Sequence, residues 1–230
     1  MIVGNGMVAG ALKDISGWEE DLLFTSGVSN SGELAGSAFL KETNLVESYI
    51  NKISPDSSFV YFSTTSIFDN SKVTNPYIIH KLSIEKLLKE SNVDFLIVRL
   101  PNLVGFSTNP HTLTNFFADS IRQGRLITLR NGAIRHLIDV ADLSVILNDI
   151  KRKFGKKRIT VNVNTDKPLS ADQILELMEE TLGKKANIQT ISERNRGIPP
   201  EAVDNNGTIN FLWKTGENYH KEMFKKYYCD

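Results

Sequence analysis

The chain has 230 residues, 40% of them hydrophobic, and its 27 Lys and Arg residues balance 27 Asp and Glu residues. This length and composition predict one compact α/β enzyme, and the zero formal charge argues against nucleic acid or an anionic membrane as a partner, because no global field would attract either. The single cysteine, Cys229, rules out an intramolecular disulfide and favours a reducing, cytoplasmic compartment.

Short apolar runs alternate with helical periodicity along the chain, which predicts a parallel sheet covered by helices. Strands are expected at residues 1–3, 21–25, 58–63, 94–99 and 159–163. Helices are expected near 7–14, 33–53, 77–91, 112–123, 139–153, 170–183 and 216–227. Ser170 and Gln173 predict a capping box at one helix start, and Gly183 a stop. The polar stretch 192–210 is interpreted as a linker or as a flap over substrate.

Two further polar features are interpreted as structural. The basic run at 151–158 fits a solvated helix end before Gly155, so a nucleic-acid site there is a remote alternative. The four histidines are scattered without ligand spacing, and no apolar stretch approaches the roughly twenty residues of a membrane span. We therefore expect neither a metal site nor a membrane segment.

The first residues, MIVGNGMVAGAL, place glycines directly after an apolar run and before a helix. Gly4 and Gly6 lack a Cβ, so the backbone can turn sharply and approach a pyrophosphate at the start of the helix. This pattern favours dinucleotide binding. An ordinary glycine-rich turn after a strand explains it equally well on its own.

Tyr77 and Lys81 in PYIIHK, with Thr64 at the end of FVYFSTT, predict a hydride-transfer site. Residues four apart on a helix project from one face, so an ammonium beside the phenol would favour the phenolate. A threonine hydroxyl at a strand end could hold the same substrate oxygen. Tyr-x-x-x-Lys alone is a weak pattern and needs its context.

That context is a series of motifs: the glycine loop, STTSIFDN, Tyr77-x-x-x-Lys81, RLPNLVG and IRHLIDVADL. Their order resembles the extended branch of the short-chain dehydrogenase/reductase superfamily, the NAD-dependent epimerase/dehydratase family. The resemblance implies a shortened, Rossmann-like doubly wound parallel sheet. Residues 1–165 would form the dinucleotide-binding core, with substrate elements around 105–138, and residues 166–230 a small C-terminal substrate-binding lobe.

The segment STTSIFDN is most similar to that of dTDP-4-dehydrorhamnose reductases. The family's 4,6-dehydratases carry Asp-Glu after the catalytic threonine, whereas this chain has Thr65 and Ser66, so dehydration is not expected. The resemblance assigns catalysis to Thr64, Tyr77 and Lys81. It assigns cofactor contacts to Gly4, Gly6, Met7, Val8, Gly27, Ser63, Tyr77, Lys81 and Pro101. Substrate contacts fall to Ser29, Asn30, Thr65, Asn102 and Arg135.

Together these features predict an NAD- or NADP-dependent reductase or epimerase that acts on a nucleotide-linked keto sugar in polysaccharide biosynthesis, with Tyr77 as the acid/base. The alternative is a catalytically silent protein of the same fold that binds NAD(P) or a nucleotide sugar. The resemblance also implies a homodimer formed through the helix that bears Tyr77.

One departure concerns the cofactor. Gly4 and Thr64 lie only 60 positions apart, where full-length members usually fit two more strand-helix units. The second predicted strand ends in Thr25, Ser26 and Gly27 and resembles the family's fourth strand. The adenosine pocket is therefore predicted to be truncated, and the sequence does not choose between NAD and NADP.

Overall fold

The computed structural model describes residues 1–69, 74–130, 134–191 and 208–229. Its centre is a six-stranded sheet in the order β1-β2-β3-β4-β9-β12, in which every neighbouring pair is parallel. The strands are β1 (Ile2–Val3), β2 (Leu22–Phe24), β3 (Ser58–Thr64), β4 (Asp94–Leu100), β9 (Ile159–Thr165) and β12 (Thr208–Trp213). The predicted α/β Rossmann-like class is confirmed.

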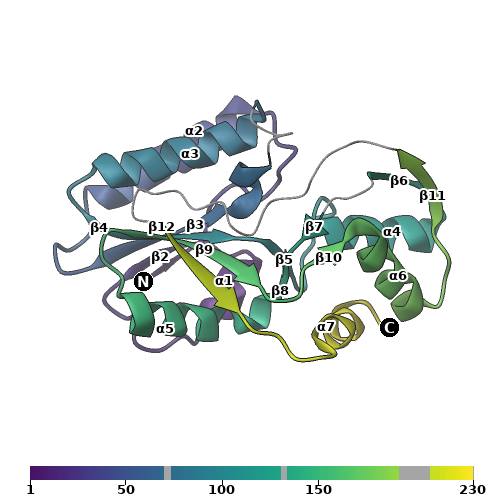
Figure 1. Cartoon of the computed structure of the whole chain (residues 1–230). Helices are drawn as coiled ribbons and strands as arrows, with labels where there is room; N and C mark the ends of the chain where they lie inside the picture. Colours follow the sequence, from purple (N-terminus) through teal and green to yellow (C-terminus); the bar gives the residue numbers. More distant parts are fainter. Residues whose placement is uncertain (70–73, 131–133, 192–207, 230) are drawn as a thin grey trace.

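Helices cover both faces of this sheet, as Figure 1 shows. Helices α2 (Gly36–Ile50) and α3 (Pro76–Glu90) lie on one face, and α1 (Met7–Leu12) and α5 (Leu143–Phe154) lie on the other. Phe59, Val60 and Tyr61 are consequently all buried. A strand buried on both faces needs apolar residues throughout rather than at alternate positions.

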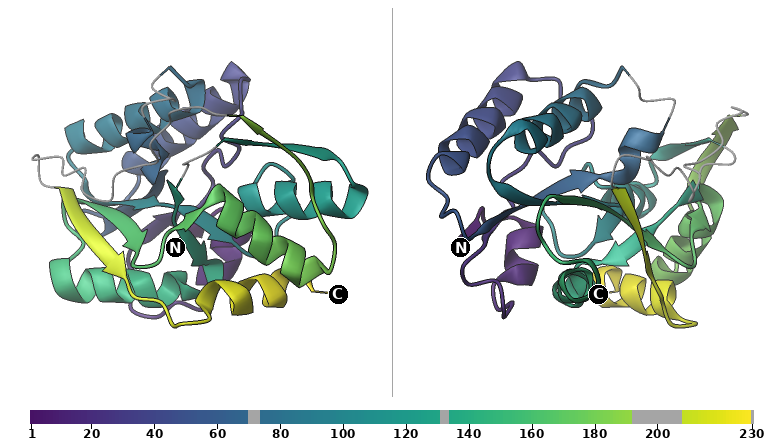
Figure 2. Two further views of the ribbon diagram at one scale, coloured as in Figure 1. Left: turned by 45° about the vertical axis from the view of Figure 1, so that its right-hand side comes forward. Right: turned by 60° about the vertical axis from the view of Figure 1, so that its left-hand side comes forward.

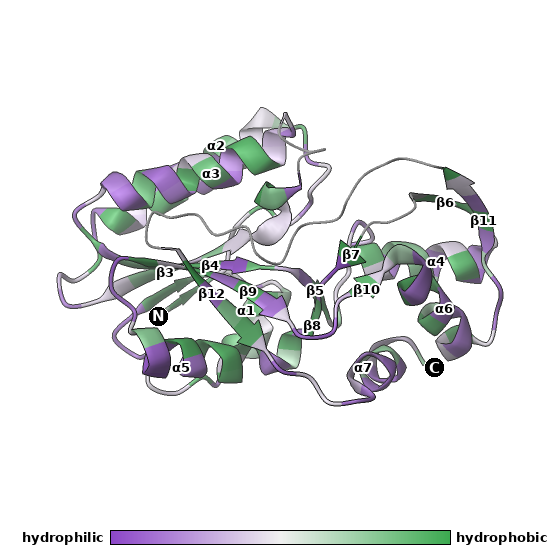
Figure 3. Cartoon of the chain, viewed as in Figure 1, coloured by the Kyte–Doolittle hydropathy of each residue, from purple (hydrophilic) through white to green (hydrophobic). Residues whose placement is uncertain are grey.

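A second lobe lies beside the sheet and has its own hydrophobic core (Figure 2). Helices α4 (Leu113–Gln123), α6 (Ala171–Leu182) and α7 (Tyr219–Tyr228) form it, with Ile121, Met178 and Phe224 buried between them. Hydrophobic and hydrophilic residues interleave along α5 and α6 in Figure 3, as expected for helices with one buried face. Three two-stranded pairs complete the structure: β5 (Asn102–Val104) with β8 (Leu137–Asp139), β7 (Ile134–Arg135) with β10 (Leu169–Ser170), and β6 (Leu126–Arg130) with β11 (Asn187–Ile191).

Local signals set the helix boundaries. The Asn75 side chain accepts hydrogen bonds from the backbone N–H groups of Tyr77 and Ile78, and Pro76 occupies the first helical position. The capping box of Ser170 and Gln173 is confirmed, as is the helix end at Gly183, whose φ is +60°. The start of α3 is thus fixed, and Tyr77 becomes its second residue.

All five predicted strands and all seven predicted helices are present, with boundaries shifted by a few residues. A short 3-10 turn, Val140–Asp142, replaces the start of the helix expected at 139–153. Residues 192–207 of the expected linker or flap lie outside the described residues, whereas 208–210 belong to β12. Strand β12, which lies in the segment predicted to form the C-terminal lobe, pairs with β9 in the central sheet.

The chain crosses from one face of the sheet to the other between β1 and β2. Helix α1 follows β1 on the face of α5, and α2 follows β2 on the opposite face. Ligands of doubly wound sheets bind at such a switch point. Only residues 4–21 connect β1 to β2, and in the described part of the chain no strand pairs with the outer edge of β1. This arrangement agrees with the shortened sheet that the sequence predicted.

None of the helices described is both long enough and apolar enough to cross a lipid bilayer. Among the same residues there is also no group of three or more His, Cys, Asp or Glu side chains arranged to hold a metal ion.

Candidate active site

A cavity of about 400 Å³ lies at the carboxyl ends of the central strands. Met7 and Val8 line it from α1, Thr25 follows β2, and Ser63 and Thr64 end β3. Parallel strands present their carboxyl ends at one edge of the sheet, and the switch point between β1 and β2 opens a crevice there. The cavity is therefore where the fold predicts a ligand.

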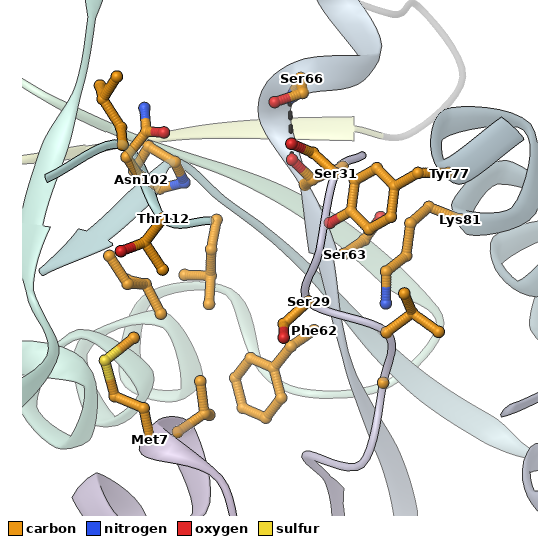
Figure 4. A pocket seen from close by; sticks show the side chains of 18 of the residues that line it. Met7, Ser29, Ser31, Phe62, Ser63, Ser66, Tyr77, Lys81, Asn102 and Thr112 are labelled. Atoms are coloured by element: carbon orange, nitrogen blue, oxygen red, sulfur yellow. Dashed lines mark hydrogen bonds between the residues drawn. The ribbon is translucent and has the colours of Figure 1, made fainter. Parts of the chain in front are cut away.

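Thr64, Tyr77 and Lys81 meet on one wall of this cavity. The Thr64 hydroxyl oxygen accepts the backbone N–H of Ser66 at 3.1 Å, and the Thr64 side chain interacts with the Tyr77 hydroxyl. The Lys81 ammonium lies 5.8 Å from the centre of the Tyr77 ring. Figure 4 shows Tyr77 and Lys81 reaching from α3 toward the strand end that carries Ser63. The hydroxyl groups of Thr64 and Tyr77 thus line the same cavity, where both could hydrogen-bond one carbonyl oxygen.

Lys81 is held from below by buried partners. Its ammonium donates to Glu42 Oε1 at 3.1 Å and to Tyr61 Oη at 3.1 Å, and both Lys81 and Glu42 are 2% exposed. An ammonium has three N–H donors. Two of them are used by these partners, which leaves a third for a hydroxyl group in the cavity.

Burial and charge set the protonation states at this wall. Burial raises the pKa of Tyr77 to about 12; the hydrogen bond with Thr64 opposes this change, and the Glu42 carboxylate adds to it. Burial also lowers the pKa of the Lys81 ammonium, which Glu42 opposes. The sequence led us to expect that Lys81 favours the phenolate. The structure gives the opposite direction, because burial raises the pKa of Tyr77 and the Glu42 carboxylate adds to this effect, so Tyr77 is protonated at neutral pH.

A second buried ion pair supports the end of β3. Arg99 donates to both Glu85 oxygens, at 2.9 and 2.6 Å, and the Ser63 hydroxyl donates to Glu85 Oε1 at 2.6 Å. Planar guanidinium and carboxylate groups fit each other in this two-pronged geometry. Ser63 is therefore oriented by α3 as well as by its own strand.

The opposite wall is polar as well, and Figure 4 shows Asn102 and Thr112 across the cavity from Tyr77. Asn102 begins β5, and its side-chain amide donates to the carbonyl of His136 at 3.4 Å. Arg135 in β7 lines the same cavity and donates to its neighbour's carbonyl at 3.0 Å. These groups could recognise a polar or anionic substrate.

Most of the residues predicted for the site line the cavity together. They are Met7, Val8, Gly27, Ser29, Ser63, Thr64, Tyr77, Lys81, Pro101, Asn102 and Arg135.

Four predicted residues do not line it. The Thr65 hydroxyl is directed at the carbonyl of Leu100, at 3.5 Å, and the Asn30 side chain accepts the backbone N–H of Gly32. Gly4 has φ +125°, and a Cβ there would lie 2.6 Å from Thr25 Oγ1, so Gly4 permits the close approach of the first two strand ends. Gly6 precedes α1 with open space beside it.

Sequence reasoning missed the residues beneath Lys81 and part of the far wall. Glu42, Tyr61 and His80 form the buried support, and Thr112 and Phe116 line the cavity from α4 and its cap. One signal was available for Glu42. It lies four residues before Val46, on the stripe of α2 that faces the sheet, where an ionised side chain needs a partner.

Comparisons with known proteins agree with this architecture. Residues 26–163 match the model of the NAD dependent epimerase/dehydratase family, a match that begins directly after β2. The comparison with curated proteins gave no match.

Several solved structures share the fold. UDP-glucose 4-epimerase from Thermotoga maritima, solved with UDP-glucose, has 15% identity and a TM-score of 0.61, over 90% of this chain and 75% of that chain. dTDP-glucose 4,6-dehydratase from Bacillus anthracis, solved with NAD, has 15% identity and a TM-score of 0.60, over 97% and 79%. The RMD protein of Pseudomonas aeruginosa, complexed with NADPH, has 14% identity and a TM-score of 0.58, over 96% and 80%.

The fold and the family match define an enzyme of the extended short-chain dehydrogenase/reductase type. The chain belongs to the NAD-dependent epimerase/dehydratase family. Its cofactor class is accordingly NAD(P), as predicted from the sequence.

The residues of the cavity fit one end of that cofactor well. Gly27 lies beside Lys81 with no room for a Cβ, and the ammonium keeps a donor for a ribose hydroxyl. The other end of the cofactor would lie against two short elements, β1 and α1.

Proposed function

We propose that the chain is an NAD(P)-dependent reductase or epimerase that acts on a nucleotide-linked keto sugar. One observation carries the proposal: Thr64, Tyr77 and Lys81 lie on one wall of a cavity at the switch point of the sheet. A hydroxyl, a phenol and an ammonium in this arrangement suit proton transfer at a carbonyl oxygen.

The role of each residue follows from its position. Tyr77 donates its proton to the carbonyl oxygen in the reductive direction and accepts it in the oxidative direction. Thr64, which lines the same cavity as Tyr77, orients that oxygen. Lys81 directs its remaining donor at the cofactor's ribose. When bound, the nicotinamide supplies the hydride chemistry.

The far wall supports a nucleotide sugar as the substrate. A guanidinium fork suits two phosphate oxygens, so we assign the nucleotide diphosphate to Arg135 and the sugar to Asn102 and Ser29. UDP-glucose bound to the related Thermotoga epimerase supports the same class. Thr65 and Ser66 stand where the family's dehydratases carry an acid/base pair, so we propose reduction or epimerisation rather than dehydration.

Other properties remain proposals. Ile79 and Leu82 on α3 are 55% and 41% exposed, which supports a homodimer through this helix. The single cysteine supports a cytoplasmic location. We also keep the division into a core of residues 1–165 and a substrate lobe within 166–230, with β12 returned to the core.

The second candidate is a silent binding protein of the same fold. The short β1 edge favours it, because less protein surrounds the cofactor's adenosine half than the nicotinamide half. Such a protein would bind a nucleotide sugar or NAD(P) without turnover.

An assay with purified protein separates the two. NADPH and a panel of 4-keto nucleotide sugars should give a loss of NADPH absorbance with the wild-type chain and none with Tyr77→Phe. Equal rates for both proteins contradict the proposed reductase. Calorimetric binding of a nucleotide sugar without any turnover, including epimerisation, favours the silent protein.

A further inference from the structure

We propose that Glu42 is a positioning residue whose buried carboxylate holds the Lys81 ammonium against β3 and balances its charge beside Tyr77. This inference rests on the proposed roles of Tyr77 and Lys81, and it explains a buried carboxylate that those roles leave unused. It predicts an active site tuned to keep Tyr77 as a proton donor.

Each oxygen of the Glu42 carboxylate accepts two hydrogen bonds. Oε1 accepts from Tyr61 Oη at 2.7 Å and from Lys81 at 3.1 Å. Oε2 accepts from the backbone N–H of Val28 at 2.7 Å and from His80 Nε2 at 3.0 Å. A fully buried ionised carboxylate persists only when it is paired and hydrogen-bonded in this way. Four residues from three segments of the chain, the loop at Val28, β3 and α3, therefore converge on one side chain.

The Glu42–Lys81 pair also lies against Gly27 and Val28, which line the cavity. A Cβ at Gly27 would come within 2.7 Å of Lys81 Nζ and 2.9 Å of Glu42 Oε1. Because Val28 donates its N–H to the same carboxylate, Glu42 fixes this loop and the lysine together. A residue at this junction positions catalytic groups without touching the substrate.

Among the charged groups around Tyr77, Glu42 is the one that balances the charge of Lys81. From α3, His80 contacts Glu42, and Glu85 is bound on both oxygens by Arg99 of β4. From β3, Tyr61 is neutral, since burial and the nearby Glu42 raise its pKa. His111 also lines the cavity.

Glu42 is itself ionised, because the hydrogen bond from His80 and the charge of Lys81 outweigh the effect of burial and lower its pKa to about 2. What remains next to Tyr77 is one ammonium and one carboxylate, a pair whose net charge is zero.

The direct test follows the titration of Tyr77 in protein labelled at the tyrosine ring carbons, observed by NMR without cofactor or substrate. Tyr77→Phe identifies the signal. In the wild type we expect no titration up to the highest pH at which the protein stays folded. In Glu42→Gln the carboxylate that raises the pKa of Tyr77 is lost, so this pKa should fall by about one to two units, toward the ordinary tyrosine value of about 10.

Two variants guard against a purely structural explanation. Tyr61→Phe removes a hydrogen bond from the same carboxylate but no charge, so the Tyr77 signal should behave as in the wild type. The double variant Glu42→Gln with Lys81→Met removes both charges together, and it should also behave as in the wild type. It serves as the test if Glu42→Gln alone does not fold, because a neutral replacement of a buried pair is better tolerated than the loss of one partner.

Three results would overturn the inference: an unchanged Tyr77 titration in folded Glu42→Gln, an equal shift in Tyr61→Phe, or a double variant whose Tyr77 titrates within the folded range. None of them depends on turnover. An inactive wild-type enzyme would therefore count against the proposed function alone, whereas these titrations bear on Glu42 alone.

Discussion

The two ends of the cavity are built very differently. The catalytic end stands on β3 and β4, seven residues each, and on the fifteen-residue helix α3, whereas the opposite end stands on a two-residue strand and a six-residue helix. Long buried strands hold side chains rigidly, which hydride and proton transfer require. Under the proposed function, the short end would contribute affinity for the far half of a dinucleotide rather than chemistry. The longer elements therefore lie where the proposed reaction needs them.

The largest effect is expected at the support of the catalytic end. Glu42→Gln leaves Lys81 buried without its partner, which should lower the free energy of unfolding at pH 7 by about 3–5 kcal/mol. The pKa of Glu42 falls from 4.5 to about 2 on folding, so its contribution is complete above about pH 4.5 and is lost as the pH falls toward 2.

Urea unfolding of both proteins at pH 7 and at pH 3 measures this, and the difference between them should shrink at the lower pH. A loss of less than about 1 kcal/mol at pH 7 contradicts a buried, paired carboxylate.

Substitution of Thr64 tests whether its hydroxyl orients the reacting carbonyl oxygen. Thr64→Val removes a hydroxyl aimed at that oxygen and should reduce kcat by about 10²–10³-fold with little change in cofactor affinity. Thr65→Val is the matched comparison, because Thr65 does not line the cavity and its hydroxyl is directed at the Leu100 carbonyl, and we expect a change within about threefold. Steady-state kinetics decides; equal losses in the two variants remove the special role of Thr64.

Substitution of Gly6 tests how much the end of the cavity built from β1 and α1 contributes to cofactor binding. A Cβ there meets no protein atom within 4 Å, so the fold tolerates Gly6→Ala, but a pyrophosphate bound at this turn would be crowded. We expect the dissociation constant of the cofactor to rise about tenfold, or about 1.4 kcal/mol. Gly10→Ala, which also has open space but lies one turn along α1, should leave it unchanged. Calorimetry that finds no difference between these variants moves the phosphates away from the loop.

The smallest effect concerns the choice of cofactor. In the described residues the sheet ends at β1, so no further strand end is present to place an acidic residue against the adenosine ribose. NADH and NADPH should therefore give kcat/KM values within about fivefold of each other, a difference of about 1 kcal/mol. A preference of a hundredfold or more for either cofactor contradicts the open edge.

Much of the fold follows from the sequence because apolar runs and caps are local signals. The run FVYFSTT marked β3, and the capping pair Ser170 and Gln173 marked α6. Strand β12 was missed because its six residues follow a long polar stretch, and only pairing with β9 makes them a strand. The two- and three-residue pairs, such as β7 with β10, lie below the length at which a pattern can be recognised.

The site divides in the same way. The meeting of Thr64, Tyr77 and Lys81 at one cavity was predictable because their motifs lie close together and in a known order. Glu42 and Tyr61 were not, because one occurs among ordinary helix residues and the other in an apolar strand that looks like core. Their connection to Lys81 is made by tertiary packing across α2, β3 and α3. The direction of the Tyr77 pKa shift depends on that packing, so the prediction of a favoured phenolate, made from the sequence, was wrong.

A crystal structure with NAD or NADP soaked into the crystals is the most direct measurement of whether this cavity is a hydride-transfer site. We expect electron density for the nicotinamide and its ribose between Pro101 and the wall of Thr64, Tyr77 and Lys81, with weaker density for the adenosine beyond β1. Density for the nicotinamide in another part of the molecule, or none at millimolar cofactor in crystals with an open cavity, would contradict this expectation.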